Sequence, residues 1–205
     1  MIGKPSMFAS RRVPVISHSW ICHRRKPRNP CQISKPFFAS IQVNYGTGLN
    51  MLTIERALPQ DAPAILALQR LAFQSEAALY NDWSIPPITQ TLEALLEEFS
   101  AGIILKAIAE GQLVGSVRAR CHDGLCEVGR LIVHPAFQRR GIGSRLLRAI
   151  EGQFPAVTRF ELFTGSKSES NLRLYQRAGY RIAQTKSLSP AVSITYLEKR
   201  ANPAG

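Results

Sequence analysis

The stretch "HPAFQRRGIGSRLLRAIEGQF", residues 134–154, decides the fold of this chain. Two glycines, Gly141 and Gly143, follow a Gln-Arg-Arg run and precede apolar residues spaced as on one face of a helix. The first turn of a helix leaves four N–H groups without intrahelical partners, and the helix dipole adds partial positive charge there. Glycine lets that backbone approach a ligand without a Cβ in the way. The stretch therefore predicts a pyrophosphate site at the start of a helix.

The spacing excludes two other phosphate-binding loops. Gly143 is followed by Ser144, Arg145 and Leu146, so neither G-x-G-x-x-G nor G-x-x-x-x-G-K-[ST] is present. A dinucleotide fold and a P-loop are therefore not expected. For the glycine spacing alone, a plain turn beside a solvated arginine pair remains the alternative.

Regular structure is expected from Met51 onward, where apolar alternation and helical periods begin. The patterns predict strands at 52–58, 103–110, 112–120, 125–133, 159–164, 180–187 and 191–199, and helices at 62–73, 92–102, 142–154 and 169–178. The order is β α α β β β α β α β β, which indicates an α+β domain of about 150 residues. We place this domain at 51–200, followed by a tail at 201–205.

The first fifty residues differ in composition from the rest. They hold eight of the 26 Lys and Arg residues and no acidic residue, whereas residues 51–205 carry 18 basic and 14 acidic side chains. We expect residues 1–50 to be a disordered extension. Three origins are open: an upstream extension before a true start at Met51, an organelle transit peptide, or a basic nucleic-acid arm.

Composition also bounds the partners. No window approaches eighteen apolar residues, so no membrane span is expected. The cysteines at 22, 31, 121 and 126 have neither a metal-ligand nor a disulfide-dense spacing, which predicts free thiols and no metal site. These features favour a cytoplasmic protein, with organelle import as the alternative if residues 1–50 are a transit peptide.

The glycine stretch and the strand before it resemble the acetyl-CoA signature of the GNAT family of N-acetyltransferases. That signature is [Q/R]-x-x-G-x-[G/A] after a strand ending in L-x-V-x-P, and the matching residues here are Leu131, Val133, Pro135, Gln138, Gly141 and Gly143. The resemblance covers roughly three-quarters of the chain and excludes residues 1–50. It implies a GNAT-type α+β fold, with a mixed, mostly antiparallel sheet of about seven strands flanked by four helices.

The resemblance also implies the reaction. An amine acceptor, from a small molecule, a peptide or a protein, would attack the acetyl group of acetyl-CoA directly in a ternary complex. A homodimer is compatible with this reading, and nucleic acid is not expected as a partner. The alternatives are a non-catalytic acyl-CoA-binding module and, less favoured, a nucleic-acid binder that uses the basic first fifty residues.

Coenzyme contacts follow from the resemblance. The strand residues before the signature would splay from a neighbouring strand and pair with the pantetheine arm, and the turn would hold the pyrophosphate. Asn171 is a further candidate contact. The predicted coenzyme-binding residues are Leu131, Ile132, Val133, Gln138, Arg139, Arg140, Gly141, Ile142, Gly143, Ser144 and Asn171.

Two proton transfers need side chains. The resemblance implies Tyr175, in the run "NLRLYQRAGY", as the acid for the leaving thiolate. It also implies Glu127, 14 residues before Gly141, as the base, with Glu161 or a water as alternatives. By strand parity Glu127 shares a face with Leu131 and Val133 unless a bulge intervenes. A structural pairing of Glu127 with a neighbouring arginine, Arg118 or Arg120, is equally open.

The acceptor side is expected between the first two helices, in "SEAALYNDWSIPP", residues 75–87. Tyr80, Asn81, Asp82 and Trp83 would offer an apolar wall with a carboxylate, which suits a cationic amine or a peptide N-terminus. Alternatively, these residues only cap and pack the helix ends.

Overall fold

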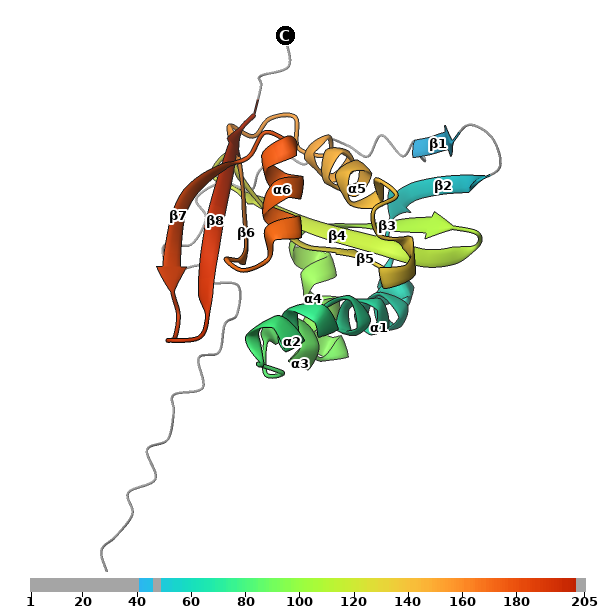
Figure 1. Ribbon diagram of the computed structural model, residues 1–205. Coiled ribbons are helices and arrows are strands. Elements are labelled where there is room, and N and C mark those ends of the chain that lie inside the picture. The colour runs from blue at the N-terminus through green and yellow to red at the C-terminus, as the bar shows by residue number, and fades with distance from the viewer. Residues whose placement is uncertain (1–40, 46–48, 202–205) are drawn as a thin grey trace, which may run out of the picture.

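The computed structural model describes residues 41–45 and 49–201, which form one eight-stranded sheet in the order β1-β2-β3-β4-β5-β6-β8-β7 (Figure 1). All neighbouring strands run antiparallel except β5 and β6, which are parallel. The elements are β1 Ile41–Tyr45, β2 Leu49–Arg56, η1 Pro59–Asp61, α1 Ala62–Ala72, α2 Gln74–Tyr80, α3 Pro86–Thr89, α4 Leu92–Ala101, β3 Ile103–Ala109, β4 Gln112–His122, β5 Leu125–Val133, η2 Pro135–Phe137, α5 Ile142–Glu151, β6 Arg159–Gly165, α6 Glu169–Arg177, β7 Arg181–Ser187 and β8 Ser193–Arg200. The predicted α+β class and mixed, mostly antiparallel sheet are confirmed.

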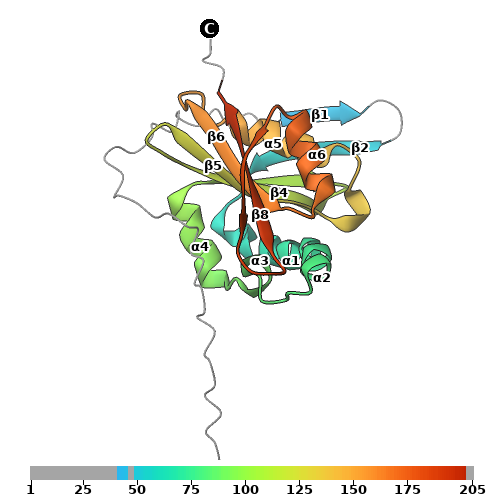
Figure 2. The same ribbon diagram turned by 60° about the vertical axis from the view of Figure 1, so that its left-hand side comes forward.

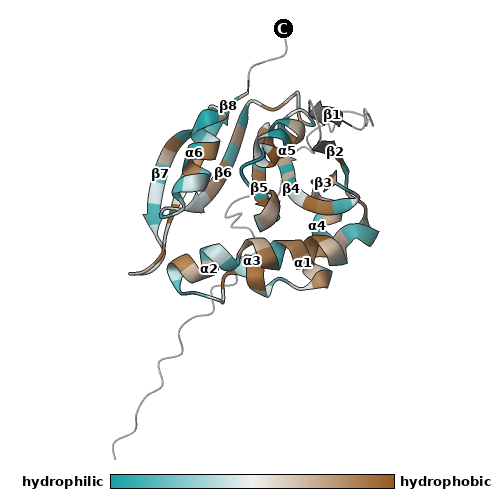
Figure 3. Cartoon of the chain, turned by 45° about the vertical axis from the view of Figure 1, so that its right-hand side comes forward, coloured by the Kyte–Doolittle hydropathy of each residue, from teal (hydrophilic) through white to brown (hydrophobic). Residues whose placement is uncertain are grey.

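Helices cover both faces of the sheet. α5 and α6 lie on one face, and α1 to α4 lie on the other (Figures 1 and 2). Strand β4 shows why, because its side chains alternate between the two faces. Val117 and Ala119 join the buried core that includes Leu147 of α5, whereas Arg118 turns to α4 and pairs with Glu98. Figure 3 shows the consequence in hydropathy: β3 and α1 are mostly hydrophobic, and the edge strand β7 is mostly hydrophilic.

Strands β5 and β6 separate after a short contact. They pair only at Leu125 with Arg159, Cys126 with Phe160 and Glu127 with Glu161, although β5 continues to Val133 and β6 to Gly165. Beyond this contact β5 keeps its pairing with β4, and β6 keeps its pairing with β8. The two strands therefore diverge toward their carboxyl ends and leave one edge of each facing the opening.

A bulge in β5 lies at the start of this divergence. Ser116 of β4 pairs with Ile132, whereas Arg118 pairs with Gly129, so β5 carries one extra residue between them. Arg130 has φ 48°, a left-handed conformation that is uncommon for a residue other than glycine. Such an extra residue bends the strand and reverses the facing of the side chains beyond it.

The bulge decides the face of Glu127. Cys126 and Val128 before it, and Leu131 and Val133 after it, all pack on the core beneath α5 and α6. Glu127 therefore points to the opposite face of the sheet, away from Leu131 and Val133. The shared face was expected only without an intervening bulge, and the extra residue in β5 changes the parity between these positions.

One strand and two α-helices were not predicted. β1 and the first two residues of β2 lie inside the segment 1–50 that was expected to be disordered; residues 1–40 and 46–48 lie outside the described residues. α2 and α3 overlap the stretch 75–87 that was expected to connect two helices. The sheet therefore has eight strands rather than about seven, and six α-helices rather than four accompany it.

The thiol expectation holds for one of two described cysteines. Cys126 is a free, buried thiol, whereas Cys121 is disulfide-bonded, contrary to the prediction. Burial raises the pKa of the Cys126 thiol. Within the described ranges, none of the helices has the length and apolar character needed to span a bilayer.

A glycine substitution tests how tightly β3 and β4 pack. A Cβ added to Gly102 would overlap the backbone carbonyl oxygen of Ala119, which can move only with its strand. We expect Gly102→Ala to lower the free energy of unfolding in urea by about 1–3 kcal/mol, the usual cost of overpacking. Gly152→Ala is the control, since its Cβ would meet nothing nearer than 3.5 Å. Equal stability of the two variants would contradict the packing described.

Candidate functional site

The glycine turn lies between β5 and α5 and is held by its own side chains. His134 Nδ1 accepts a hydrogen bond from the Ala136 N–H at 3.2 Å, and Gln138 Nε2 donates to the Val133 carbonyl at 3.2 Å. Gly141, with φ 76°, directly precedes the helix in the left-handed conformation that glycine adopts without strain. These contacts fix the path by which the chain leaves β5 and enters α5.

The turn brings backbone N–H groups together at the start of α5. The first turn of α5 closes with the Arg145 N–H donating to the Gly141 carbonyl at 3.2 Å, so the N–H groups of residues 141–144 precede the helical ladder. Arg139 and Arg140 are exposed beside them, and the Arg140 guanidinium lies 4.9 Å from the centre of the Phe137 ring. Free N–H groups, a helix dipole and arginines together suit a phosphate group.

Gly143 connects the turn to α6. A Cβ added to it would lie 3.6 Å from Leu174 and 3.8 Å from Val133, so its backbone passes close to both. Tyr175, the residue after Leu174, is 7% exposed and meets the Tyr180 ring edge-to-face, with ring centres 6.1 Å apart. Burial first, and then the charge of Glu76, raise the pKa of Tyr175 above its usual value.

Glu76 on α2 was not singled out from the sequence, yet the structure brings it to α6. Its Oε1 atom accepts hydrogen bonds from Ser168 Oγ and from Asn171 Nδ2, the latter at 3.1 Å. Asn171 Nδ2 also lies 3.4 Å from Thr164 Oγ1 of β6. Asn171 and Tyr175 thus share the α6 face that was predicted, but the Asn171 amide is engaged by protein groups on that face.

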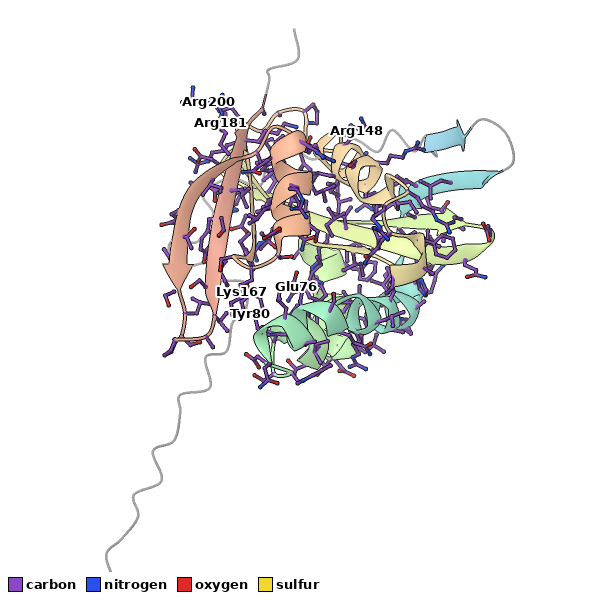
Figure 4. The ribbon with its side chains drawn as sticks, in the orientation of Figure 1. Glu76, Tyr80, Arg148, Lys167, Arg181 and Arg200 are labelled. Carbon is purple, nitrogen blue, oxygen red and sulfur yellow. The ribbon has the colours of Figure 1, made fainter. Side chains whose placement is uncertain are left out.

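Tyr80 is the predicted acceptor-side residue that reaches the opening. Its hydroxyl accepts the Lys167 N–H at 2.7 Å, and its ring lies 5.3 Å from Lys167 Nζ. A Cβ on Gly165 would lie 2.6 Å from the Tyr80 hydroxyl, so only glycine allows this approach. Figure 4 shows Glu76, Tyr80 and Lys167 together where α2 approaches the start of α6.

The other three predicted acceptor residues form a turn. Asn81 ends α2 in the left-handed conformation, with φ 48°. Asp82 Oδ1 accepts from the Ser84 N–H at 2.9 Å and from the Ser84 hydroxyl at 2.6 Å. Trp83 is 54% exposed. The local contacts of Asn81 and Asp82 match the alternative in which these residues end a helix. The helical spacing of Glu76 and Tyr80, four apart, is the signal that could have identified this face of α2.

The two predicted bases are both paired with arginines. Glu127 pairs with Nε of Arg120, and Glu161 pairs with Arg159 at 2.8 Å. Glu127 also lines a cavity of about 40 Å³ between α4 and β3–β5, which is too small for an acetyl acceptor. Of the two predicted alternatives for Glu127, the structural pairing with Arg120 is the one observed.

Two further arginines lie on this face of the sheet: Arg118 is buried and Arg130 is partly buried. Desolvation lowers the pKa of Arg118 to about 9 and that of Arg130 to about 10. Both guanidinium groups remain cationic at neutral pH, since arginine holds its proton even when buried. In residues 41–45 and 49–201 no group of three or more His, Cys, Asp and Glu side chains could hold a metal ion.

Comparison with known proteins matches this arrangement. The family model described as "Acetyltransferase (GNAT) domain" matches residues 100–182, which include the diverging strands, the glycine turn and Tyr175. Residues 100–182 are therefore similar to the GNAT acetyltransferase domain. The UPF0157 protein YqkA of Bacillus subtilis (strain 168) is 27% identical over 127 residues, which is 60% of this chain. The chain covers only 36% of that curated relative.

Solved structures confirm the GNAT fold. The ribosomal-protein-S18-alanine N-acetyltransferase of Escherichia coli has a TM-score of 0.63 at 15% identity, covering 76% of this chain and 97% of its own. The PaiA N-acetyltransferase of Thermoplasma acidophilum, solved with coenzyme A, has a TM-score of 0.62 at 18% identity. The match covers 73% of this chain and 98% of the PaiA chain. YncA of Salmonella typhimurium, solved with acetyl-CoA, has a TM-score of 0.59 at 19% identity. The match covers 75% of this chain and 95% of the YncA chain.

The glycine turn yields a direct binding test. An aspartate at position 141 would place a negative charge among the N–H groups offered to the pyrophosphate. We expect Gly141→Asp to weaken coenzyme A binding, measured by calorimetry, by more than about a hundredfold, since juxtaposed like charges cost several kcal/mol. Gly111→Asp is the matched control: Gly111 also has a left-handed φ of 73° and stands in open space on the β3–β4 turn. Undiminished affinity in Gly141→Asp would refute the turn as the pyrophosphate site.

Proposed function

We propose that this chain is an acetyl-CoA-dependent N-acetyltransferase of the GNAT family, which moves an acetyl group to a primary amine by direct attack in a ternary complex. The divergence of β5 from β6 carries this proposal. It opens one edge of β5 toward α6, with the glycine turn at its end and Tyr175 buried across from it. Acetyl-CoA would supply the activated acetyl thioester.

The donor side has a part for each portion of the coenzyme. The edge of β5 beyond Glu127 offers backbone groups to which the pantetheine arm can add like a strand. Backbone N–H groups on the same edge can also polarise the thioester carbonyl. The turn from Gln138 to Ser144 offers N–H groups and arginines to the pyrophosphate. A cradle built mainly of backbone fits a donor that is the same whichever acceptor is used.

Tyr175 is suited to protonate the leaving thiolate. Because burial and Glu76 raise its pKa, the hydroxyl remains protonated at neutral and mildly alkaline pH. The acid form of Tyr175 is therefore lost only above the ordinary tyrosine pKa of about 10. A coenzyme thiol, with a pKa of about 8.5 like that of cysteine, can accept this proton with a modest mismatch.

The acceptor side is proposed at α2, from Glu76 to the turn at Trp83. The likeness to a ribosomal-protein alanine N-acetyltransferase supports including a peptide or protein amine among the candidates. A non-catalytic acyl-CoA-binding module would need the glycine turn and would leave Tyr175 without a chemical role. Release of free coenzyme A from acetyl-CoA, measured with a panel of small amines and peptide N-termini, separates the two functions. Tight coenzyme binding with no amine-dependent release would contradict the transferase.

Tyr175→Phe tests the proposed acid. We expect kcat to fall by about a hundredfold, at the low end of the range for general acid–base catalysis, because the thiolate must leave without its proton. Coenzyme A affinity should change little. Tyr180→Phe is the control: Tyr180 is also buried, but its hydroxyl donates to Glu151 at 2.9 Å, at the C-terminal end of α5. Unchanged turnover of Tyr175→Phe would remove Tyr175 from the mechanism.

A further inference from the structure

Helix α2 places a carboxylate beside the buried Tyr175. Glu76 is partly buried, and its charge contributes to the raised pKa of the Tyr175 hydroxyl. In the part of the chain that the structure describes, no lysine or arginine forms an ion pair with Glu76. A carboxylate that forms no ion pair and lies beside a group with a shifted pKa is a candidate for proton transfer.

The hydrogen bonds of Glu76 fix its orientation and leave one oxygen for a ligand. Ser168 and Asn171 both donate to Oε1, so among residues 41–45 and 49–201 the carboxylate is oriented through one oxygen only. Oε2 is the atom that can accept a proton without disturbing either bond. This separation of holding and reacting atoms suits a group that must gain and lose a proton in each cycle.

The surrounding charged groups have other contacts. On the β6–α6 connection, Lys167 Nζ lies over the Tyr80 ring at 5.3 Å. On β5, the Arg130 guanidinium lies 5.9 Å from the centre of the Phe73 ring. Phe73 precedes Glu76 by three residues in the sequence. On α6, Tyr175 stays neutral because its pKa is raised. A cation that enters the opening would therefore find Glu76 as the carboxylate next to Tyr175.

Resting on the proposed N-acetyltransferase function, we propose that Glu76 receives the acceptor as an ammonium cation and removes its proton. The acceptor class is then a positively charged primary amine that approaches past α2. Glu76 would be a catalytic residue in contact with the reacting nitrogen. This role differs from that predicted for Glu127, which lies on β5 and pairs with Arg120.

The proton balance is as follows. The ammonium gives one proton to Oε2 of Glu76, and the neutral nitrogen forms a bond to the acetyl carbon. The carbon–sulfur bond breaks, and the departing sulfur takes the hydroxyl proton of Tyr175. Tyr175 regains a proton from the newly acetylated nitrogen, and Glu76 releases its own to water. One acetyl transfer thus yields an amide, a thiol and one proton in solution.

Glu76→Gln in the full chain tests this role, because the glutamine oxygen still accepts from Ser168 and Asn171 but cannot take a proton. The assay is coenzyme A release from acetyl-CoA between pH 6 and 10, with phenethylamine, lysine and an alanine-terminated tripeptide as acceptors. We expect kcat/KM at pH 7 to fall by about a hundredfold with coenzyme A affinity unchanged. The deficit should shrink as pH approaches the pKa of the acceptor amine, since neutral amine then arrives from solution.

Three variants complete the experiment. Glu76→Asp keeps a carboxylate and should retain part of the pH 7 activity, which a purely structural loss would not explain. Glu169→Gln, at an exposed α6 residue paired with Arg173, should match the wild type. Glu127→Gln tests the alternative base and should show wild-type kcat/KM over the whole range from pH 6 to 10.

The contrary results are distinct. Wild-type rates and pH profile in Glu76→Gln would overturn the role of Glu76 and leave it a structural contact between α2 and α6. A deficit equal at every pH, or lost coenzyme binding, would overturn it as well. A pH-dependent loss confined to Glu127→Gln would assign the base to β5. A wild-type chain that binds coenzyme A but transfers to none of the amines would refute the proposed function itself, and this role with it.

Discussion

The extra residue at Arg130 is the constraint on which the rest of the site depends. A regular β5 would keep pairing along its length, and its alternation would send Leu131 and Val133 to the same face as Glu127. With Arg130 at φ 48°, β5 stays paired with β4 across a one-residue shift of register, while its other edge leaves β6 after three pairs. The exposed edge carries backbone groups that need partners, so the same feature that opens the sheet also creates a binding edge. The bulge is anchored at its side chain, because the Arg130 guanidinium lies over Phe73, at the junction of α1 and α2.

The opening is spanned by contacts between residues far apart in the chain. Glu76 meets Ser168 and Asn171 across 92 and 95 residues, and Tyr80 meets Lys167 across 87. These bonds attach the helix layer that would admit the acceptor to the helix that carries Tyr175. A shift of α2 would therefore move the Glu76 charge relative to the Tyr175 hydroxyl. The pKa of Tyr175, which depends first on burial and then on Glu76, is thereby coupled to the position of the acceptor helix.

Features set by residues close together in the sequence could be predicted, whereas features set by contacts between distant residues could not. The strands, the main helices and the glycine turn are encoded locally, by alternation, by a 3.6-residue period and by glycines, and these predictions are confirmed as fold. The bulge has no such signature, since nothing in "EVGRLIV" marks Arg130 for a left-handed φ. Without the bulge, the side of the sheet to which Glu127 points could not be predicted. Helix α2 is only seven residues long and has no side-chain cap at its N-terminus, so its start is not marked in the sequence. Glu76 then gains its place from contacts some ninety residues away.

The coenzyme side and the acceptor side of the site differ in the same way. The proposed coenzyme side would use backbone N–H groups of the turn and backbone atoms of one strand, which many side chains leave intact. The proposed acceptor side would use side chains on a short helix, where one substitution changes the charge. Glu127 and Glu161 show the contrast among the carboxylates themselves: to take a proton, each would have to give up its contact with an arginine. Glu76 is held by neutral hydroxyl and amide donors at one oxygen, so protonation at the other separates no ion pair. Charge balance, more than position along the sheet, therefore distinguishes the carboxylate that can act as a base from those that hold strands together.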